Sequence, residues 1–262
     1  MPSDVVVGDS GNIYIVDGGN HRVLTFNSRG KFIRTVGSKG SGRLQFNGPV
    51  GIGIDHQENL YIADSGNHRI QILNNNSKFI SSIPLIRNGQ GLRPIDVAIS
   101  KKKQLFVTTN TNHAVMVYSN TGRFVRQWGG KGNNPGKFRY PATIDIGPDN
   151  NIYVVDVLNS RVQIFTSAGK LITIAGSWGV LPGQLFRPKG VTIDNKENIY
   201  ISDSYLNVIE VYDRNKQFRY VLGDQTSELR FDTPTGLTID KKQRLYVTQM
   251  LANKVSILTP EN

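Results

Sequence analysis

The sequence predicts an all-β protein built from six copies of one four-stranded unit, and three observations support this prediction. An aromatic residue inside a short apolar run recurs every 45 to 47 residues, as Tyr14, Tyr61, Phe106, Tyr153, Tyr200 and Tyr246. Each run is followed by turn-forming residues and then by a second run in which polar and apolar residues alternate. A proline opens each repeat, at a strand start where no ladder donor is needed. Six such repeats are typical of a six-bladed β-propeller.

The second repeat shows how the four strands are ordered. Its strands are expected at residues 50–54, 60–63, 69–73 and 78–83, named a to d here. Strand a has aliphatic residues at alternate positions, which we expect to pack on a neighbouring blade. The chain is read as a single domain, residues 1–262, with blades at approximately 1–47, 48–92, 93–139, 140–186, 187–232 and 233–262.

The sixth repeat ends after its third strand. Strands are expected at 235–239, 245–248 and 254–258, and residues 259–262 contain no phenylalanine-bearing fourth strand. The last blade is therefore predicted to lack its outer strand within this chain. The backbone of residues 255–258 would then be a free edge, to be completed by an upstream segment of a longer protein or by pairing with another chain.

Composition limits the function classes. The net charge of +11 favours anionic partners such as nucleic acid, acidic polysaccharide or acidic protein. The chain has no cysteine, so disulfides and thiolate metal sites are excluded. No run of about 18 apolar residues is present, so no membrane span is expected, and the first residues show no leader pattern.

The repeated motifs carry a resemblance to a known family. Pro-x-Gly-x-x-x-Asp, Asn-[IL]-Tyr-[IV]-x-Asp, Asn-His-Arg-[VI]-x-[IV] and Gly-[KR]-[FL]-[IV] follow one another in register, which resembles the NHL-repeat family of six-bladed β-propellers. The resemblance covers essentially the whole chain and implies the fold. It implies no single function, because the family includes RNA-binding domains of TRIM-NHL proteins, bacterial sensor and scaffold domains, and a metal-dependent amidating lyase.

The loops that join strand d to the next strand a are the expected ligand-binding surface. In blades 1 to 4 they combine basic and aromatic residues, an arrangement that could hold phosphates and stack bases. Some of the aromatic residues are expected to be core plugs instead, and the opposite face is also basic at residues 101–103 and 241–242. The candidate ligand-binding residues are Lys39, Arg43, Arg93, Lys131, Lys137, Arg139, Tyr140 and Arg187.

An acid and an arginine recur across the b–c turn, as in Asp64 and Arg69. A structural pair is the favoured interpretation, with a ligand contact as the alternative. Because we expect the pair to be exposed and screened by solvent, its expected contribution to stability is only ~0–1 kcal/mol.

Two further sets of residues, three histidines and three aspartates, could suggest a metal site. His21, His68 and His113 occupy one repeated position, but packed sheets lie ~10 Å apart, so they cannot share an ion. Asp4, Asp96 and Asp145 lie on inner strands and could face the central channel. Capture of backbone N–H groups or water is favoured there, and a channel cation is the alternative.

Taken together, these patterns predict a non-catalytic binding or scaffold module with no cofactor and no metal. A protein partner is favoured, because a propeller face is broad and decorated with loops. Single-stranded RNA is the alternative, and a metal-dependent lyase is third. No HExxH, GxSxG, P-loop or EF-hand pattern occurs.

Overall fold

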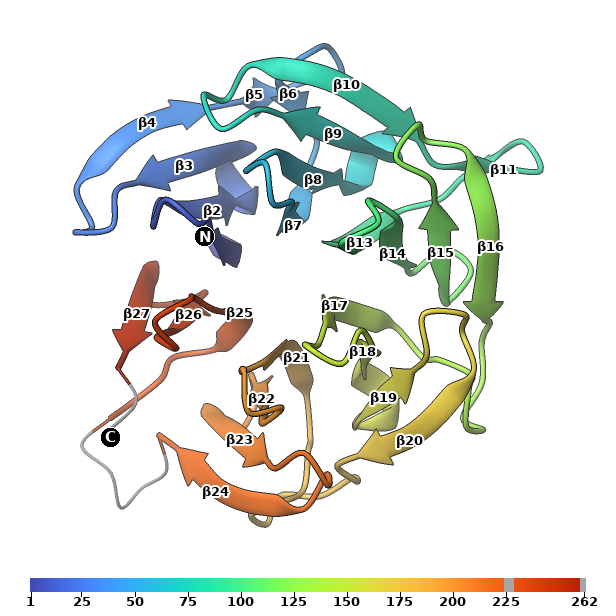
Figure 1. Cartoon of the computed structure of the whole chain (residues 1–262), viewed down its shortest axis with the longest axis vertical. Coiled ribbons are helices and arrows are strands. Elements are labelled where there is room, and N and C mark those ends of the chain that lie inside the picture. The colour runs from blue at the N-terminus through green and yellow to red at the C-terminus, as the bar shows by residue number, and fades with distance from the viewer. Residues whose placement is uncertain (224–228, 260–262) are drawn as a thin grey trace.

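A computed structural model describes residues 1–223 and 229–259 and forms a ring of six blades around a central axis (Figure 1). Five blades are four-stranded antiparallel sheets, and the sixth has three strands in the described part of the chain. The predicted all-β, six-bladed propeller is confirmed. Among the described residues, no helix is long and apolar enough to cross a membrane.

The blades follow the chain in order, and each begins at the predicted proline. Blade 1 contains β1 (Pro2–Val7), β2 (Ile13–Asp17), β3 (Arg22–Phe26) and β4 (Phe32–Val36). Blade 2 contains β7 (Pro49–Ile54), β8 (Leu60–Asp64), β9 (Arg69–Leu73) and β10 (Phe79–Pro84). Blade 3 contains β13 (Pro94–Ile99), β14 (Leu105–Thr109), β15 (Ala114–Tyr118) and β16 (Phe124–Gly129).

The second half of the ring repeats this order. Blade 4 contains β17 (Pro141–Ile146), β18 (Ile152–Asp156), β19 (Arg161–Phe165) and β20 (Leu171–Ala175). Blade 5 contains β21 (Pro188–Ile193), β22 (Ile199–Asp203), β23 (Val208–Tyr212) and β24 (Phe218–Leu222). Blade 6 contains β25 (Pro234–Ile239), β26 (Leu245–Gln249) and β27 (Lys254–Leu258). The loops also form two short pairs, β5 (Ser38–Lys39) with β6 (Gln45–Phe46), and β11 (Ile86–Arg87) with β12 (Gln90–Gly91).

This topology gives the ring two distinct faces. The b–c turns and the d–a loops lie together on one face, here the upper face, whereas the a–b and c–d turns lie on the lower face. In blades 1, 2 and 4 the b–c turn is a short 3-10 turn, at Gly18–Asn20, Ser65–Asn67 and Val157–Asn159. The upper face therefore carries the predicted ligand loops.

The core lies between successive blades. The repeated aromatic residues Tyr14, Phe106 and Tyr153 are fully buried there, as their position inside strand b requires. Loop residues Phe46 and Phe138 are also fully buried, so they are core plugs. Gly37 lies against the Phe46 plug and has a φ of 114°. A Cβ at this position would lie 2.7 Å from the Phe46 ring, so only glycine fits.

Candidate functional site

Buried acid–arginine pairs fix the d–a loops on the upper face. Arg69 Nε donates to Asp64 at 2.8 Å, and its Nη atoms donate to the carbonyl oxygens of Ser41, Gly42 and Gln45 at 2.7–2.8 Å. Only 15% of the Arg69 side chain and none of the Asp64 side chain is exposed. The expectation of a solvent-screened pair is wrong here, because the loop folds back over the arginine.

The other two pairs show what decides this burial. Arg161 and Asp156 repeat the buried arrangement, with 11% and 0% exposure, and Arg161 also donates to the carbonyl oxygens of Asn134 and Lys137. Arg22 remains 40% exposed, and within the described ranges its side chain donates one hydrogen bond, to Asp17. The pair is thus buried where a d–a loop from the preceding blade covers it.

Two of the three repeated histidines, His21 and His113, also fix loops, whereas Nδ1 of His68 is buried without a hydrogen-bond partner among the described residues. His21, His68 and His113 adopt the left-handed conformation, with φ of 51° to 56°. Nδ1 of His21 accepts a hydrogen bond from the backbone N–H of Gly48, and Nδ1 of His113 accepts one from that of Tyr140. The described residues contain no group of three or more acids and histidines that could hold a metal ion.

The predicted basic residues are exposed but do not converge. Arg43 lies over the Phe79 ring at 5.3 Å, and Lys137 Nζ donates to the carbonyl oxygen of Gly129 at 2.9 Å. Two of the eight candidates, Tyr140 and Arg187, line the central cavity. The remaining six, Lys39, Arg43, Arg93, Lys131, Lys137 and Arg139, are exposed on the d–a loops and do not line it.

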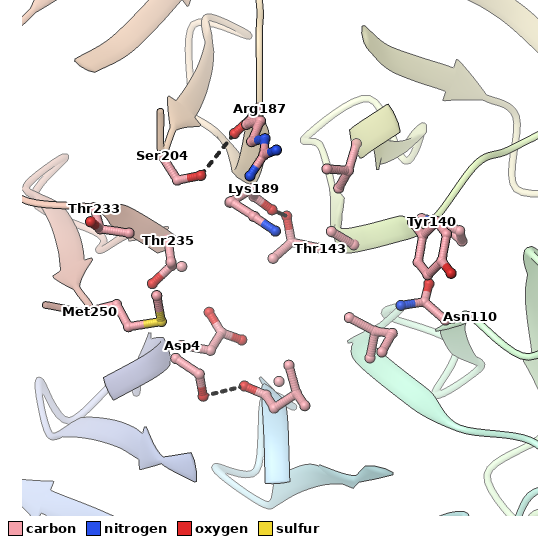
Figure 2. A pocket seen from close by; sticks show the side chains of 18 of the residues that line it. Asp4, Asn110, Tyr140, Thr143, Arg187, Lys189, Ser204, Thr233, Thr235 and Met250 are labelled. Atoms are coloured by element: carbon pink, nitrogen blue, oxygen red, sulfur yellow. Dashed lines mark hydrogen bonds between the residues drawn. The ribbon is translucent and has the colours of Figure 1, made fainter. Parts of the chain in front are cut away.

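A cavity of about 690 Å³ opens at the centre of the upper face (Figure 2). All six blades contribute to its wall. The residue after each strand-opening proline forms a ring around the cavity, and this ring consists of Ser3, Val50, Ile95, Ala142, Lys189 and Thr235. Residues of the b–c turns, among them Leu158, Tyr205 and Met250, form the rim.

Lysine 189 is the charged member of this ring. Its side chain points into the cavity near Arg187 and Thr143 (Figure 2), and its amino group has no hydrogen-bond or ion-pair partner among the described residues. Burial lowers the pKa of Lys189, and the Arg187 guanidinium lowers it further, while Asp203 partly offsets them. A partly buried cation without a partner is costly, so an anionic ligand group would be stabilised there.

A neutral acceptor at the same cavity is also left without a partner. The side-chain oxygen Oδ1 of Asn110 is buried and accepts no hydrogen bond from the part of the chain that the structure describes. Buried polar groups are normally hydrogen-bonded, but this oxygen is not accessible from the cavity, so it is an unpaired acceptor within the wall and not a ligand contact.

Aromatic rings extend from the rim across blade 5. The ring centroids of Phe186 and Tyr205 lie 4.3 Å apart, and those of Trp178 and Phe186 lie 6.5 Å apart. Trp178 is 72% exposed and Tyr205 is 59% exposed. These three residues, the aromatic ladder, present stacking surface beside the cavity.

The inner aspartates line a separate cavity of about 160 Å³ on the axis. Asp4 accepts the backbone N–H groups of Val5 and Ile52, and Asp96 accepts those of Val97 and Ile144. Each of these carboxyl groups thus joins the inner strands of adjacent blades. This arrangement is the backbone capture that the sequence favours over a cation.

Burial makes these carboxyl groups weak acids. Burial and the charge of Asp96 raise the pKa of Asp4 well above its usual value. Burial raises the pKa of Asp96 to about 7 and that of Asp145 to about 6. Asp145 accepts the N–H of Ile146.

Sequence reasoning missed Lys189. The signal was present, because the residue after the strand-opening proline faces the axis in every repeat. Five of these six residues are uncharged, which makes the lysine in blade 5 the exception.

Solved structures with this fold come from proteins of several activities. The chain resembles a catalytically inactive histidine-to-alanine variant of virginiamycin B lyase from Staphylococcus aureus with quinupristin (18% identity, TM-score 0.72, 100% of this chain and 82% of that one). It resembles a gluconolactonase from Xanthomonas campestris (15%, TM-score 0.73, 95% and 82%). It also resembles an auxiliary nutrient binding protein from Bacteroides thetaiotaomicron (14%, TM-score 0.73, 98% and 69%). At these identities the likeness shows the fold alone.

The chain matches no curated protein sequence. The NHL repeat model matches residues 1–26 and 46–73. A second model, described as a 6-bladed beta-propeller, matches residues 93–160 and 148–257, which together are more than half of the chain. The chain carries NHL repeats and belongs to this 6-bladed beta-propeller family.

Proposed function

We propose that the chain is a non-catalytic binding module whose upper face and central cavity receive an acidic segment of a protein partner. The unpartnered amino group of Lys189 inside the cavity carries this proposal. A carboxylate that enters the cavity would meet Lys189 and Arg187 together. It would relieve the cost that burial and Arg187 impose on the lysine cation.

The shape of the site favours a protein segment. Apolar side chains such as Val50, Ile95 and Leu158 line the cavity beside the two cations, so the site offers apolar contact around one charged group. Such a combination suits an acidic side chain flanked by apolar residues. The exposed arginines of the d–a loops would add long-range attraction for an acidic partner.

The histidines argue against lyase chemistry. The related lyase is described as catalytically inactive when a histidine is replaced by alanine. None of the four histidines of this chain lines the central cavity. His21 and His113 use Nδ1 to hold a backbone N–H, so this nitrogen is not free to accept a proton from a substrate.

Single-stranded RNA is the second candidate, and the aromatic ladder is the observation that favours it. Trp178, Phe186 and Tyr205 offer faces on which bases could stack, and Arg187 is the neighbour of Phe186 in the chain. RNA binding would depend steeply on salt because many phosphates would be neutralised. The ladder is local to blade 5, whereas the cations are spread round the face, so we rank RNA second.

The test uses a fluorescein-labelled octaglutamate peptide and a labelled oligouridine, followed by fluorescence anisotropy. We expect octaglutamate to bind, and Lys189→Met to weaken it by roughly tenfold, the equivalent of about 1.4 kcal/mol. Lys242→Met is the control, because it removes one exposed lysine from the lower face. Equal binding by Lys189→Met and the control would contradict the proposed site, and tight binding of oligouridine alone would favour RNA.

A further inference from the structure

The outer edge of β27 has no strand partner in the described part of the chain. A groove of about 600 Å³ lies between this edge and blade 1. Its walls contain apolar side chains from both blades, namely Ile13, Ile15, Leu24, Phe26, Val255 and Ile257. Ile257 is 43% exposed, although it lies in the middle of a strand. The predicted free edge is therefore present together with an apolar groove beside it.

The other five blades show which residue types of strand d cover the corresponding edge of strand c. In each of them the second residue of strand c faces an apolar residue of strand d, and the last residue of strand c faces phenylalanine or leucine. The first set of pairs is Val23–Val36, Ile70–Ile83, Val115–Trp128, Val162–Ala175 and Ile209–Leu222. The second set is Phe26–Phe32, Leu73–Phe79, Tyr118–Phe124, Phe165–Leu171 and Tyr212–Phe218.

The register of blade 6 follows directly from this pattern. Val255 is the second residue of β27 and Leu258 is the last. A covering strand that ran antiparallel to β27 would place a phenylalanine or leucine opposite Leu258. It would place an apolar residue, four positions later, opposite Val255. Its backbone would continue the ladder that β25, β26 and β27 already form.

The charges at one end of the groove add a further requirement. Lys254 and Arg22 line the groove beyond Val255, and both side chains are at least partly exposed. The acid in the same wall, Asp17, is already paired with Arg22 and with the amino group of Met1. The end next to Lys254 therefore has excess positive charge, and acidic residues that follow the apolar position would complement it.

We propose that this groove binds an extended segment of a separate protein partner, which adds a fourth strand to blade 6. The segment has phenylalanine or leucine, an apolar residue four positions later, and acidic residues directly after it. The edge backbone supplies the hydrogen bonds, and the groove supplies selectivity through Val255, Ile257 and Lys254. The groove shares no lining residue with the central cavity, and the proposal does not depend on what that cavity binds.

The probe is an N-acetylated, fluorescein-labelled peptide that reproduces residues 30–36 of this chain and ends in two glutamates. A control peptide carries serine in place of the residues that correspond to Phe32 and Val36. Anisotropy titrations of the whole chain should show binding of the first peptide, at least roughly tenfold weaker binding of the second, and a higher Tm with the first.

Two protein variants locate the binding. Ile257→Asp should weaken the peptide by roughly tenfold or more. The control Ile33→Asp, at a residue of β4 that is 40% exposed, should leave it unchanged. Lys254→Glu should also weaken binding, and at this exposed position it tests the site without disturbing the core.

Three results would overturn the proposal. The first is equal affinity for the two peptides, and the second is peptide binding that neither Ile257→Asp nor Lys254→Glu weakens. The third is concentration-dependent dimerisation of the wild-type chain in sedimentation velocity, abolished by Ile257→Asp, because that would assign the edge to a second copy of the chain.

Discussion

Replacing Arg69 with alanine should destabilise the protein far more than the same change at Arg22. The change at Arg69 removes the ion pair with Asp64 and the hydrogen bonds to three loop carbonyl oxygens. It also leaves the fully buried Asp64 carboxylate without its cation. The change at Arg22 removes a single hydrogen bond to Asp17, which keeps Asn20 and the amino group of Met1 as partners.

The structure sets the expected magnitudes. Breaking a buried ion pair by removing one partner costs about 3–5 kcal/mol, and we expect a loss in this range for Arg69→Ala. An exposed pair contributes about 0–1 kcal/mol, and we expect this for Arg22→Ala. For a protein of this size, 1 kcal/mol corresponds to ~2–4 °C in Tm, so the Arg69 variant should melt roughly 10 °C lower.

Circular dichroism during heating and during urea unfolding measures both losses. Arg69→Lys should recover little of the loss, because lysine keeps the charge but cannot donate to Asp64 and the loop carbonyls at once. If Arg69→Ala and Arg22→Ala both cost less than about 1 kcal/mol, the buried network contributes no more than an exposed pair, and the reasoning fails.

Three other predictions follow from the charges. The pKa of Asp96 is about 7 in the folded chain but near 4 when unfolded, so between these values the folded state binds the extra proton. The free energy of unfolding, measured by urea titration, should therefore fall as pH rises from 5 to 8, and an increase over this range would contradict the prediction. Burial raises the pKa of Glu210 to about 7, and Gln71 and Gln163 occupy its position in blades 2 and 4. Glu210→Gln should therefore raise Tm at pH 8 and change it less at pH 5, whereas equal shifts at both pH values would rule out the titration of Glu210 as the cause. Replacing four exposed arginines of the upper face with glutamate should abolish octaglutamate binding and change Tm little; the four are Arg43, Arg93, Arg139 and Arg187. Unaltered binding would refute a role for these arginines.

Most of the fold could be predicted because each blade repeats its own local signals. The proline, the aromatic residue of strand b and the turn residues recur in register, so strand order and the three-stranded last blade follow from spacing alone. The Asp64–Arg69 pair was also predictable, because the two residues face each other across a hairpin.

The depth of burial could not be predicted. Arg69 is covered because residues 41–45 of the preceding loop fold back over it, and this path depends on contacts between blades. The spacing of residues does not encode that path.

The cavity was harder to predict than the fold. Its ring combines one residue from each of six repeats, and charge counted along the loops drew attention to Lys39, Arg43 and Lys131, which lie away from it. Lys189 is a single basic residue in a strand. Its significance depends on its position at the axis and on the absence of a partner among the described residues, which only coordinates reveal.

The central claim is that the amino group of Lys189 binds an acidic group inside the central cavity. NMR titration of the chain with ¹³C-labelled lysine, in which the Lys189→Met variant assigns the signal, reports on this group directly. We expect octaglutamate to shift the Lys189 signal at low peptide concentration and to raise the lowered pKa of Lys189, because a carboxylate nearby stabilises the cation. An unshifted Lys189 signal, with shifts confined to lysines of the loops or of the lower face, would contradict the account.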